Sequence, residues 1–348
     1  MKRGKPEKYV ALAAMIRQLI KRDRLKRNDA LPSERKLAEQ FKCSHLTVRK
    51  ALGLLEQDKL IYKEPSRGNF VGPRPPQRGK SNLIGFIFPD DEIFYYKLFA
   101  QLEKSFSEAG LHPVVHLTHS IKEKEERILD FLNQANAEAV IAVPNAQCRD
   151  KYAALDIPVI FFDLSIDNLD IPAITSDDYR GAVSATEHLI SLGHRRIAHI
   201  GGIYEHTSEL RLQGYCDTLK KHQIALSNRL IKQQTPSREM GYYAAKELFE
   251  TSLPPTALFC GNDTIAAGVI RYLNLNNIKC PTDCSIVGFG NTAIAEDLNL
   301  TSISQNSPKI ADALRNHLRF ILNGEAPPAA TIIPTSLIIR ESSGRPSS

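Results

Sequence analysis

The sequence predicts an α/β protein in which a small helical head with a β-hairpin precedes a larger body of parallel sheets. Apolar residues recur at helical spacing in the first part of the chain, and after residue 82 short apolar runs alternate with helix-length segments. The charges divide at the same place. Residues 1–80 contain 21 Lys and Arg against 8 Asp and Glu, whereas residues 81–348 contain 24 against 31. A basic head on an acidic body makes nucleic acid the first partner to test.

Length and composition exclude several classes of protein. The 348 residues allow two or three domains with a substantial core. The longest apolar runs, such as 83–88, are far shorter than the roughly 20 residues of a membrane-spanning helix, which excludes a transmembrane protein. The six cysteines lack the paired spacings of a zinc finger and favour a reduced cytoplasmic protein. Export is the alternative, because basic residues precede the apolar run 9–16, but Arg17 interrupts that run and the helical spacing continues beyond it.

The head is expected to hold three helices and a hairpin. The apolar spacing predicts a helix over 9–21, and Ser33 can cap a second helix that buries Leu37, Ala38 and Phe41. Ser44 can cap a third helix, whose core face is formed by Val48, Ala51, Leu52 and Leu55.

Two strands, 60–63 and 69–71, then flank a turn that carries Arg67 at its tip. Three helices followed by a hairpin make a winged helix-turn-helix. The next segment, 72–82, has no apolar periodicity and three prolines, which predicts a semi-rigid linker.

The body is expected to form two lobes of parallel strands covered by helices on both faces, because its roughly 265 residues exceed what one sheet commonly organises. The apolar runs that predict strands are 83–88, 113–117, 139–143, 158–162, 196–201, 256–260 and 285–289.

The third helix of the head has the residues that a major-groove helix needs. Small polar and cationic side chains, Ser44, His45, Thr47 and Arg49, lie at its start and on its outer face. Arg35 begins the preceding helix and, like Arg67, is placed to meet phosphate or the minor groove. Any one of these cations taken alone is better explained as a solvated surface charge, and only their order along the chain favours DNA.

The same segment resembles the GntR-type winged-helix regulators over residues 8–71. The matching motifs are Leu-Pro-Ser-Glu-Arg-Lys-Leu-Ala at 31–38, Ser-His-Leu-Thr-Val-Arg-Lys-Ala-Leu at 44–52 and Gly-Asn-Phe-Val at 68–71. His45 stands where that family usually has arginine. The resemblance implies that Arg35, Ser44, His45, Thr47, Arg49 and Gly68 approach the DNA. Arg67 joins this expected DNA-binding set because of its place at the tip of the turn.

In the body, a ligand is expected in the crevice at the carboxyl ends of the strands. Candidates there are Asp163, Asn262 and Phe289, with Phe94, Tyr95 and Arg211 added from neighbouring segments. Aromatic faces with carboxylate, amide and guanidinium groups suit a sugar. Each residue also has a structural explanation: Asn262 can cap the next helix, and Phe94 can belong to the core.

This region resembles the LacI/GalR-type sensor, whose type I fold is shared with periplasmic sugar-binding proteins. The motifs lie at 177–182, 188–197, 211–215, 261–263 and 285–289, and the resemblance covers about residues 82–342. A GntR-type head on such a sensor looks like the arabinose-repressor class. Gly290 stands where most members have a sugar-binding aspartate, for which Asn291 is a candidate substitute. The resemblance implies that the effector contacts Phe94, Tyr95, Asp163, Arg211, Asn262, Phe289 and Gln305.

The expected domains are therefore a winged-helix domain at 1–71, a linker at 72–82 and an effector-binding and dimerisation domain at 83–348. Within the last, one lobe is expected to comprise 83–175 with 306–334, and the other 176–305 with 335–342.

Other signals predict no metal, cofactor or catalytic site. The histidines at 112, 116 and 119 lie close together without a carboxylate or cysteine at a matching distance. The chain also lacks a Gly-x-x-x-x-Gly-Lys loop and a Gly-x-Ser-x-Gly elbow.

We therefore expect a cytoplasmic, nucleoid-associated repressor, not an enzyme, that binds palindromic double-stranded operator DNA as a homodimer and is released by a small sugar, most simply a monosaccharide. The alternatives are an exported sugar-binding receptor and a sugar- or nucleotide-processing enzyme.

Overall fold

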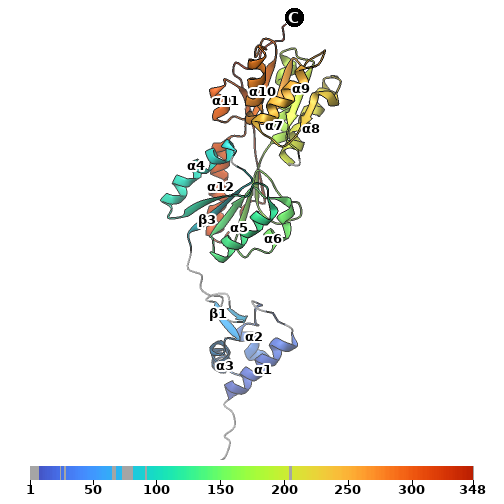
Figure 1. Cartoon of the computed structure of the whole chain (residues 1–348). Helices are drawn as coiled ribbons and strands as arrows, with labels where there is room; N and C mark the ends of the chain where they lie inside the picture. Colours follow the sequence, from blue (N-terminus) through green and yellow to red (C-terminus); the bar gives the residue numbers. More distant parts are fainter. Residues whose placement is uncertain are drawn as a thin grey trace, which may run out of the picture. The chain divides into compact units, whose positions relative to one another are not determined.

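The computed structural model describes residues 8–23, 25–26, 29–64, 68–72, 81–90, 92–203 and 206–347. The chain divides into two compact units, residues 1–79 and 80–348. The predicted fold class is confirmed: the first unit is a helical domain with a hairpin, and the second has two lobes of largely parallel strands flanked by helices (Figure 1). Within the described ranges, no helix is long and apolar enough to cross a membrane.

The head contains α1 (Lys8–Arg22), α2 (Glu34–Gln40), α3 (His45–Gln57) and the antiparallel strands β1 (Ile61–Glu64) and β2 (Gly68–Val71). Both predicted caps are confirmed. The Ser33 hydroxyl accepts from the Lys36 amide at 3.3 Å, and the Ser44 hydroxyl accepts from the Thr47 amide at 3.2 Å. The core joins one face of each helix, with Leu12, Ile16, Leu37, Val48, Ala51, Leu55 and Ile61 all buried.

The first lobe contains strands β3 (Leu83–Phe88), β4 (His112–Leu117), β5 (Ala139–Ala142), β6 (Val159–Phe162), β7 (Ala173–Ser176) and β13 (Ala330–Ile333). They form a parallel sheet in the order β13-β7-β6-β5-β3-β4. Helices α4 (Ile93–Glu108) and α12 (Ser307–Leu322) pack on one face. The other face is covered by α5 (Lys122–Gln134), the short η1 (Ala146–Cys148) and α6 (Arg149–Ala153).

The second lobe contains strands β8 (Ile197–Gly201), β9 (Ile231–Gln233), β10 (Ala257–Cys260), β11 (Ser285–Gly290), β12 (Thr301–Ser304) and β14 (Ser336–Ile338). Their order is β14-β12-β11-β10-β8-β9, and only the β12–β14 pair is antiparallel. Helices α7 (Asp178–Ser191) and α8 (His206–Lys221) cover one face. The opposite face carries η2 (Asn228–Leu230), α9 (Arg238–Phe249), α10 (Asp263–Leu275) and α11 (Ala293–Asp297).

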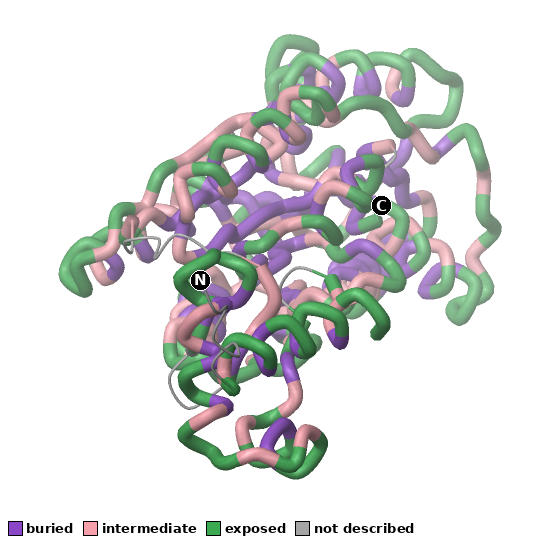
Figure 2. The backbone as a smooth tube through the Cα atoms, turned by 90° about the horizontal axis from the view of Figure 1, so that it is seen from below, coloured by how far each residue is buried: buried purple, intermediate pink, exposed green. Residues whose placement is uncertain are grey.

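Because helices cover both faces of each sheet, the central strands are buried and exposure is concentrated on the outer faces of the helices (Figure 2). This burial explains why six of the seven strands predicted from apolar runs are central ones. The seventh, β4, lies at the edge of the first sheet. Strands β7, β9, β12, β13 and β14 have only three or four residues and were not predicted; all five lie at or next to a sheet edge.

The chain passes between the lobes three times: after β7, after β12, and between β13 and β14. The three crossings touch one another. The side-chain amide of Gln305 donates to the Ser176 hydroxyl at 3.2 Å, and the Asp177 amide donates to the Ile333 carbonyl at 3.0 Å. The crossings therefore form one compact hinge beside the carboxyl ends of the strands.

We expect His199 to make the body less stable in acid. Its buried ring lies against Tyr215 and Phe259, and Nδ1 donates to the Phe259 carbonyl at 3.0 Å. Burial lowers the pKa of His199 from 6.5 to about 4. Between these two pH values the unfolded chain binds a proton on His199 and the folded chain does not. The free energy of unfolding should therefore fall by up to about 1.4 kcal/mol for each unit by which the pH is lowered in this range.

Thermal unfolding at pH 7 and pH 5, for the native protein and a His199→Phe variant, measures this contribution. The variant should lose less stability between the two pH values than the native protein. The same loss in both proteins would assign the acid sensitivity to other groups.

Candidate nucleic-acid interface and ligand cavity

The start of α3 presents polar side chains to solvent because the opposite face of the helix is anchored in the core. Ser44 and His45 are exposed and Thr47 is half-buried, with its hydroxyl 2.8 Å from that of Ser44. One turn on, Arg49 is exposed while Val48 is completely buried. This arrangement leaves the polar side of the helix available to a DNA groove.

Arg49 is held in position by Glu34, the first residue of α2. Its Nε donates to Glu34 Oε2 at 2.8 Å, and Lys63 Nζ reaches Glu34 Oε1 at 3.2 Å. The hydrogen bond from Arg49 is the main reason that the pKa of Glu34 is lowered. Glu34 therefore links α2, α3 and β1, and the two cations lie on either side of it.

The other predicted DNA-binding residues are distributed as follows. The side chain of Arg35 is 82% exposed and pairs only weakly with Glu39, one turn along α2. Gly68 begins β2 at a φ of +118°, a backbone conformation that favours glycine, so Gly68 has a structural reason of its own. Arg67 lies outside the described residues. That these groups contact DNA stays a prediction.

A cavity of about 430 Å³ lies between the two lobes of the body. The first lobe contributes the start of α4 and the end of β6, and the second contributes the starts of α8, α9 and α10 and the end of β11. All seven predicted effector residues line it: Phe94, Tyr95, Asp163, Arg211, Asn262, Phe289 and Gln305. Their convergence at the carboxyl ends of the strands agrees with the usual site in such folds.

The Arg211 side chain in the cavity is fixed by hydrogen bonds, an ion pair and an aromatic contact. Its Nε and Nη2 each lie 2.7 Å from Asp178 Oδ1, and Nη1 donates to the Gly261 carbonyl at 2.8 Å. The guanidinium also stacks over the Phe289 ring at 3.9 Å. Three of its five N–H groups are thus used internally, and two remain for a ligand.

The partner of Arg211, Asp178, is almost completely buried at the start of α7. Burial raises the pKa of Asp178, and the nearby Arg211 opposes that rise. Sequence reasoning missed Asp178 as a site residue, although it belongs to the motif at 177–182. Its position in a helical first turn is equally typical of a capping carboxylate, and only the tertiary contact reveals its role.

Several of the predicted effector residues also have a structural role. The Tyr95 hydroxyl donates to Asp163 Oδ2 at 3.0 Å across the first lobe. Asn262 Oδ1 caps α10 by accepting from the Ile265 amide at 2.8 Å, while its Nδ2 donates across the cavity to Glu92 at 3.0 Å. Phe94 and Phe289 are core residues that also line the cavity.

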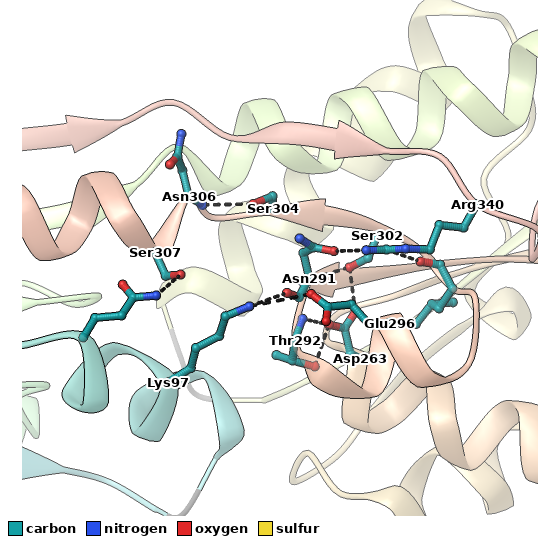
Figure 3. A network of polar contacts seen from close by, with 12 residues as sticks. Lys97, Asp263, Asn291, Thr292, Glu296, Ser302, Ser304, Asn306, Ser307 and Arg340 are labelled. Atoms are coloured by element: carbon teal, nitrogen blue, oxygen red, sulfur yellow. Dashed lines mark hydrogen bonds and ion pairs between the residues drawn. The ribbon is translucent and has the colours of Figure 1, made fainter.

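Gly290 has a φ of +119°, and a Cβ added there would lie 3.2 Å from Thr292 Cγ2. An aspartate at this position would be strained, so the loop itself favours glycine. Asn291 is not among the residues that line the cavity. Its side-chain oxygen instead accepts from Arg340 Nη2 at 2.8 Å (Figure 3).

Buried Asp263 fixes this loop. One of its oxygens accepts from the Thr292 amide at 2.8 Å and from the Thr292 hydroxyl at 2.9 Å, and the other accepts from the Ser302 hydroxyl at 2.6 Å (Figure 3). Burial raises the pKa of Asp263, and these hydrogen bonds lower it. Lys97 on α4 reaches the same loop from the first lobe, 3.5 Å from the Asn291 carbonyl.

Within the part of the chain that the structure describes, no group of three or more His, Cys, Asp or Glu is arranged to hold a metal ion. The histidines at 112, 116 and 119 lie on and just after β4, where the His116 ring packs edge-on against Phe131.

Comparison with known proteins gives two family matches. Residues 8–71 match the bacterial regulatory proteins of the gntR family, and residues 186–343 match the periplasmic binding protein-like domain. The arabinose metabolism transcriptional repressor of Geobacillus stearothermophilus is 28% identical over 87% of this chain and 88% of its own length. The transcriptional regulator DegA of Bacillus subtilis is 29% identical over 76% of this chain and 81% of its own length.

Solved structures match the body. A periplasmic binding protein/LacI transcriptional regulator from Alkaliphilus metalliredigens, complexed with D-xylulofuranose, superposes with a TM-score of 0.66 at 28% identity, covering 75% of this chain and 99% of that one. The regulator CcpA of Lactococcus lactis gives a TM-score of 0.69 at 20% identity, covering 75% and 98%, and supports the fold alone.

Proposed function

We propose that this chain, which matches the bacterial regulatory proteins of the gntR family over residues 8–71 and the periplasmic binding protein-like domain over residues 186–343, is a transcription repressor that a small sugar releases from its operator. One observation carries the proposal: a basic head with an exposed helix face is linked to a cavity whose polar groups come from both lobes. The curated relatives are transcriptional regulators, in agreement with the prediction that the chain is not an enzyme.

Sugar is the ligand class that the cavity chemistry supports. Arg211 offers two N–H groups, Asp163 offers a carboxylate, and Phe94 and Phe289 offer aromatic surface. Such groups recognise hydroxyls and the C–H faces of a sugar ring. One relative is named for arabinose metabolism, and one solved neighbour holds D-xylulofuranose. Both of these sugars are pentoses.

The proposed active form is a homodimer that binds a palindromic operator in the cytoplasm, at the nucleoid. A second groove on the second lobe supports self-association. It lies along α10 and α11 and is lined by apolar residues, among which Leu275 is 64% and Leu298 39% exposed, together with the polar side chains of Arg238, Arg271, Asn274 and Asp297. The domain limits 1–71, 72–82 and 83–348, with the lobe limits given above, are part of this proposal.

Cleft closure is the proposed signal. Contacts from both lobes are made together only when the cleft is closed, as in the bond between Glu92 and Asn262. In a dimer formed through the bodies, closure would change the distance between the points where the linkers begin. The prolines of the linker resist absorbing that change. The spacing of the heads would then no longer fit the operator half-sites.

We expect ligand and operator to weaken each other's binding by the same factor, about 5–150-fold. Calorimetry with the most stabilising sugar of a thermal-shift panel, with and without saturating operator, measures this factor. A flexible Gly/Ser insertion after residue 76 should reduce the coupling while both separate affinities are preserved.

Equal sugar affinities with and without operator contradict the proposal. Tighter sugar binding on the operator would instead make the sugar a corepressor. Full coupling in the extended protein would show that the signal does not need a stiff linker.

A further inference from the structure

We propose that Glu92 is a specificity-determining residue of the cavity: its carboxylate takes a hydroxyl or ammonium donor of the effector and excludes an effector that places a carboxylate or phosphate beside Asn262. This inference rests on the proposed function, because it refines which sugars the same cavity accepts.

The position of Glu92 directs its side chain into the cavity. Glu92 is the residue before α4, where a side chain commonly caps the helix, but it makes no such capping bond. Its backbone amide donates to Asp90 Oδ1 at 3.0 Å, which fixes the chain at this point. The carboxylate instead accepts a hydrogen bond from Asn262 Nδ2 at 3.0 Å, from the opposite lobe.

A ligand that binds to Asn262 must also lie next to the Glu92 carboxylate. Its Oδ1 is already used to cap α10, so Nδ2 is the part of this side chain that can bind a ligand across the cleft. Nδ2 is the atom that Glu92 contacts. A ligand group that reaches the amide of Asn262 therefore lies next to the Glu92 carboxylate, which favours a group that can donate a hydrogen bond in return.

The charges that line the cavity oppose an anion. Asp90, Glu92, Asp163 and Glu239 line it, against two cations, Arg211 and Arg238. Arg211 is committed to Asp178, and both Asp163 and Glu92 lie close enough to help raise the pKa of Arg211. Like charges brought together at a partly dehydrated site are strongly unfavourable.

The helix ends at the cavity contribute the opposite charge. Helices α4, α9 and α10 begin there, and their N-termini alone would attract an anion. Carboxylates at these positions offset that attraction: Glu92 lies at the start of α4, Glu239 in the first turn of α9 and Asp263 in the first turn of α10. The cavity is therefore suited to an uncharged or amine-bearing polyol.

The test compares matched sugars on the full-length native protein, on Glu92→Gln and on a control variant, Glu296→Gln. Glu296 is a carboxylate of the second lobe that faces Lys97 and does not line the cavity. The panel pairs D-ribose, L-arabinose, D-xylulose and D-glucose with their phosphates, D-glucose also with D-glucuronate and D-glucosamine. Dissociation constants are measured by calorimetry.

For the native protein, we expect the phosphate or carboxylate of a sugar that binds to bind at least about tenfold more weakly than its neutral parent. Glu92→Gln should reduce this ratio several-fold and weaken any amino sugar, whereas Glu296→Gln should leave the ratio unchanged. An anionic sugar that binds the native protein as tightly as its parent overturns the inference and leaves the proposed sugar response intact.

A ratio that Glu92→Gln does not change removes Glu92 as the selecting residue. A panel in which no sugar binds contradicts the proposed effector class, and the inference falls with it.

Discussion

An Arg211→Ala protein should no longer respond to sugar, although it should still bind its operator. The substitution removes the two N–H groups that remain for a ligand and the guanidinium that stacks over Phe289. It also leaves the Asp178 carboxylate buried without a cation, which should cost about 3–5 kcal/mol of stability. The sugar-induced thermal shift and the operator affinity of the same preparation measure the two effects separately.

A double variant separates the binding role of Arg211 from its structural role. Asp178→Asn combined with Arg211→Ala removes both buried charges, so much of the lost stability should return while the sugar response stays absent. Arg238→Ala is the control for losing a cavity cation that has no such buried partner among the described residues. A native thermal shift in either Arg211→Ala protein would place the ligand elsewhere.

Arg49→Ala should weaken operator binding by about 1–3 kcal/mol if the guanidinium pairs with a guanine edge. The head should stay folded, because the Arg49 side chain is exposed and Glu34 keeps its contact with Lys63. The native protein should also bind more weakly as salt rises, since neutralised phosphates release counterions. A mobility-shift titration at several salt concentrations measures both effects.

The matched control is Lys104→Ala, which removes one exposed positive charge from the body. Its operator affinity should equal that of the native protein. An Arg49→Ala protein that binds the operator as tightly as this control would place Arg49 outside the interface.

Local signals in the sequence were sufficient for much of the fold. A serine before a helix needs only the backbone amides of the next turn, so the caps at Ser33 and Ser44 could be predicted from a few residues. Central strands could be predicted because both of their faces are buried and their sequences are continuously apolar. Strand β12, Thr-Ser-Ile-Ser, is formed by pairing with distant segments and has no such pattern.

The candidate site divides in the same way. The seven expected effector residues converge on one cavity because the fold class already implies where strand ends meet. Glu92 and Asp178 were missed because each acts through a partner far away in the sequence, at Asn262 and Arg211 respectively. A carboxylate at a helix start has an ordinary local explanation, so sequence alone gives no reason to assign it to a ligand site.

The three crossings of the hinge also affect the order in which the protein can be completed on the ribosome. Helix α12 and strand β13 belong to the first lobe but follow almost the whole of the second lobe in the chain. The first lobe therefore leaves the ribosome without one edge strand and without the helix that contributes Ile310 and Leu314 to its core. It must wait, with apolar surface uncovered, until the second lobe has been synthesised. A premature stop codon after residue 305 consequently damages both lobes at once.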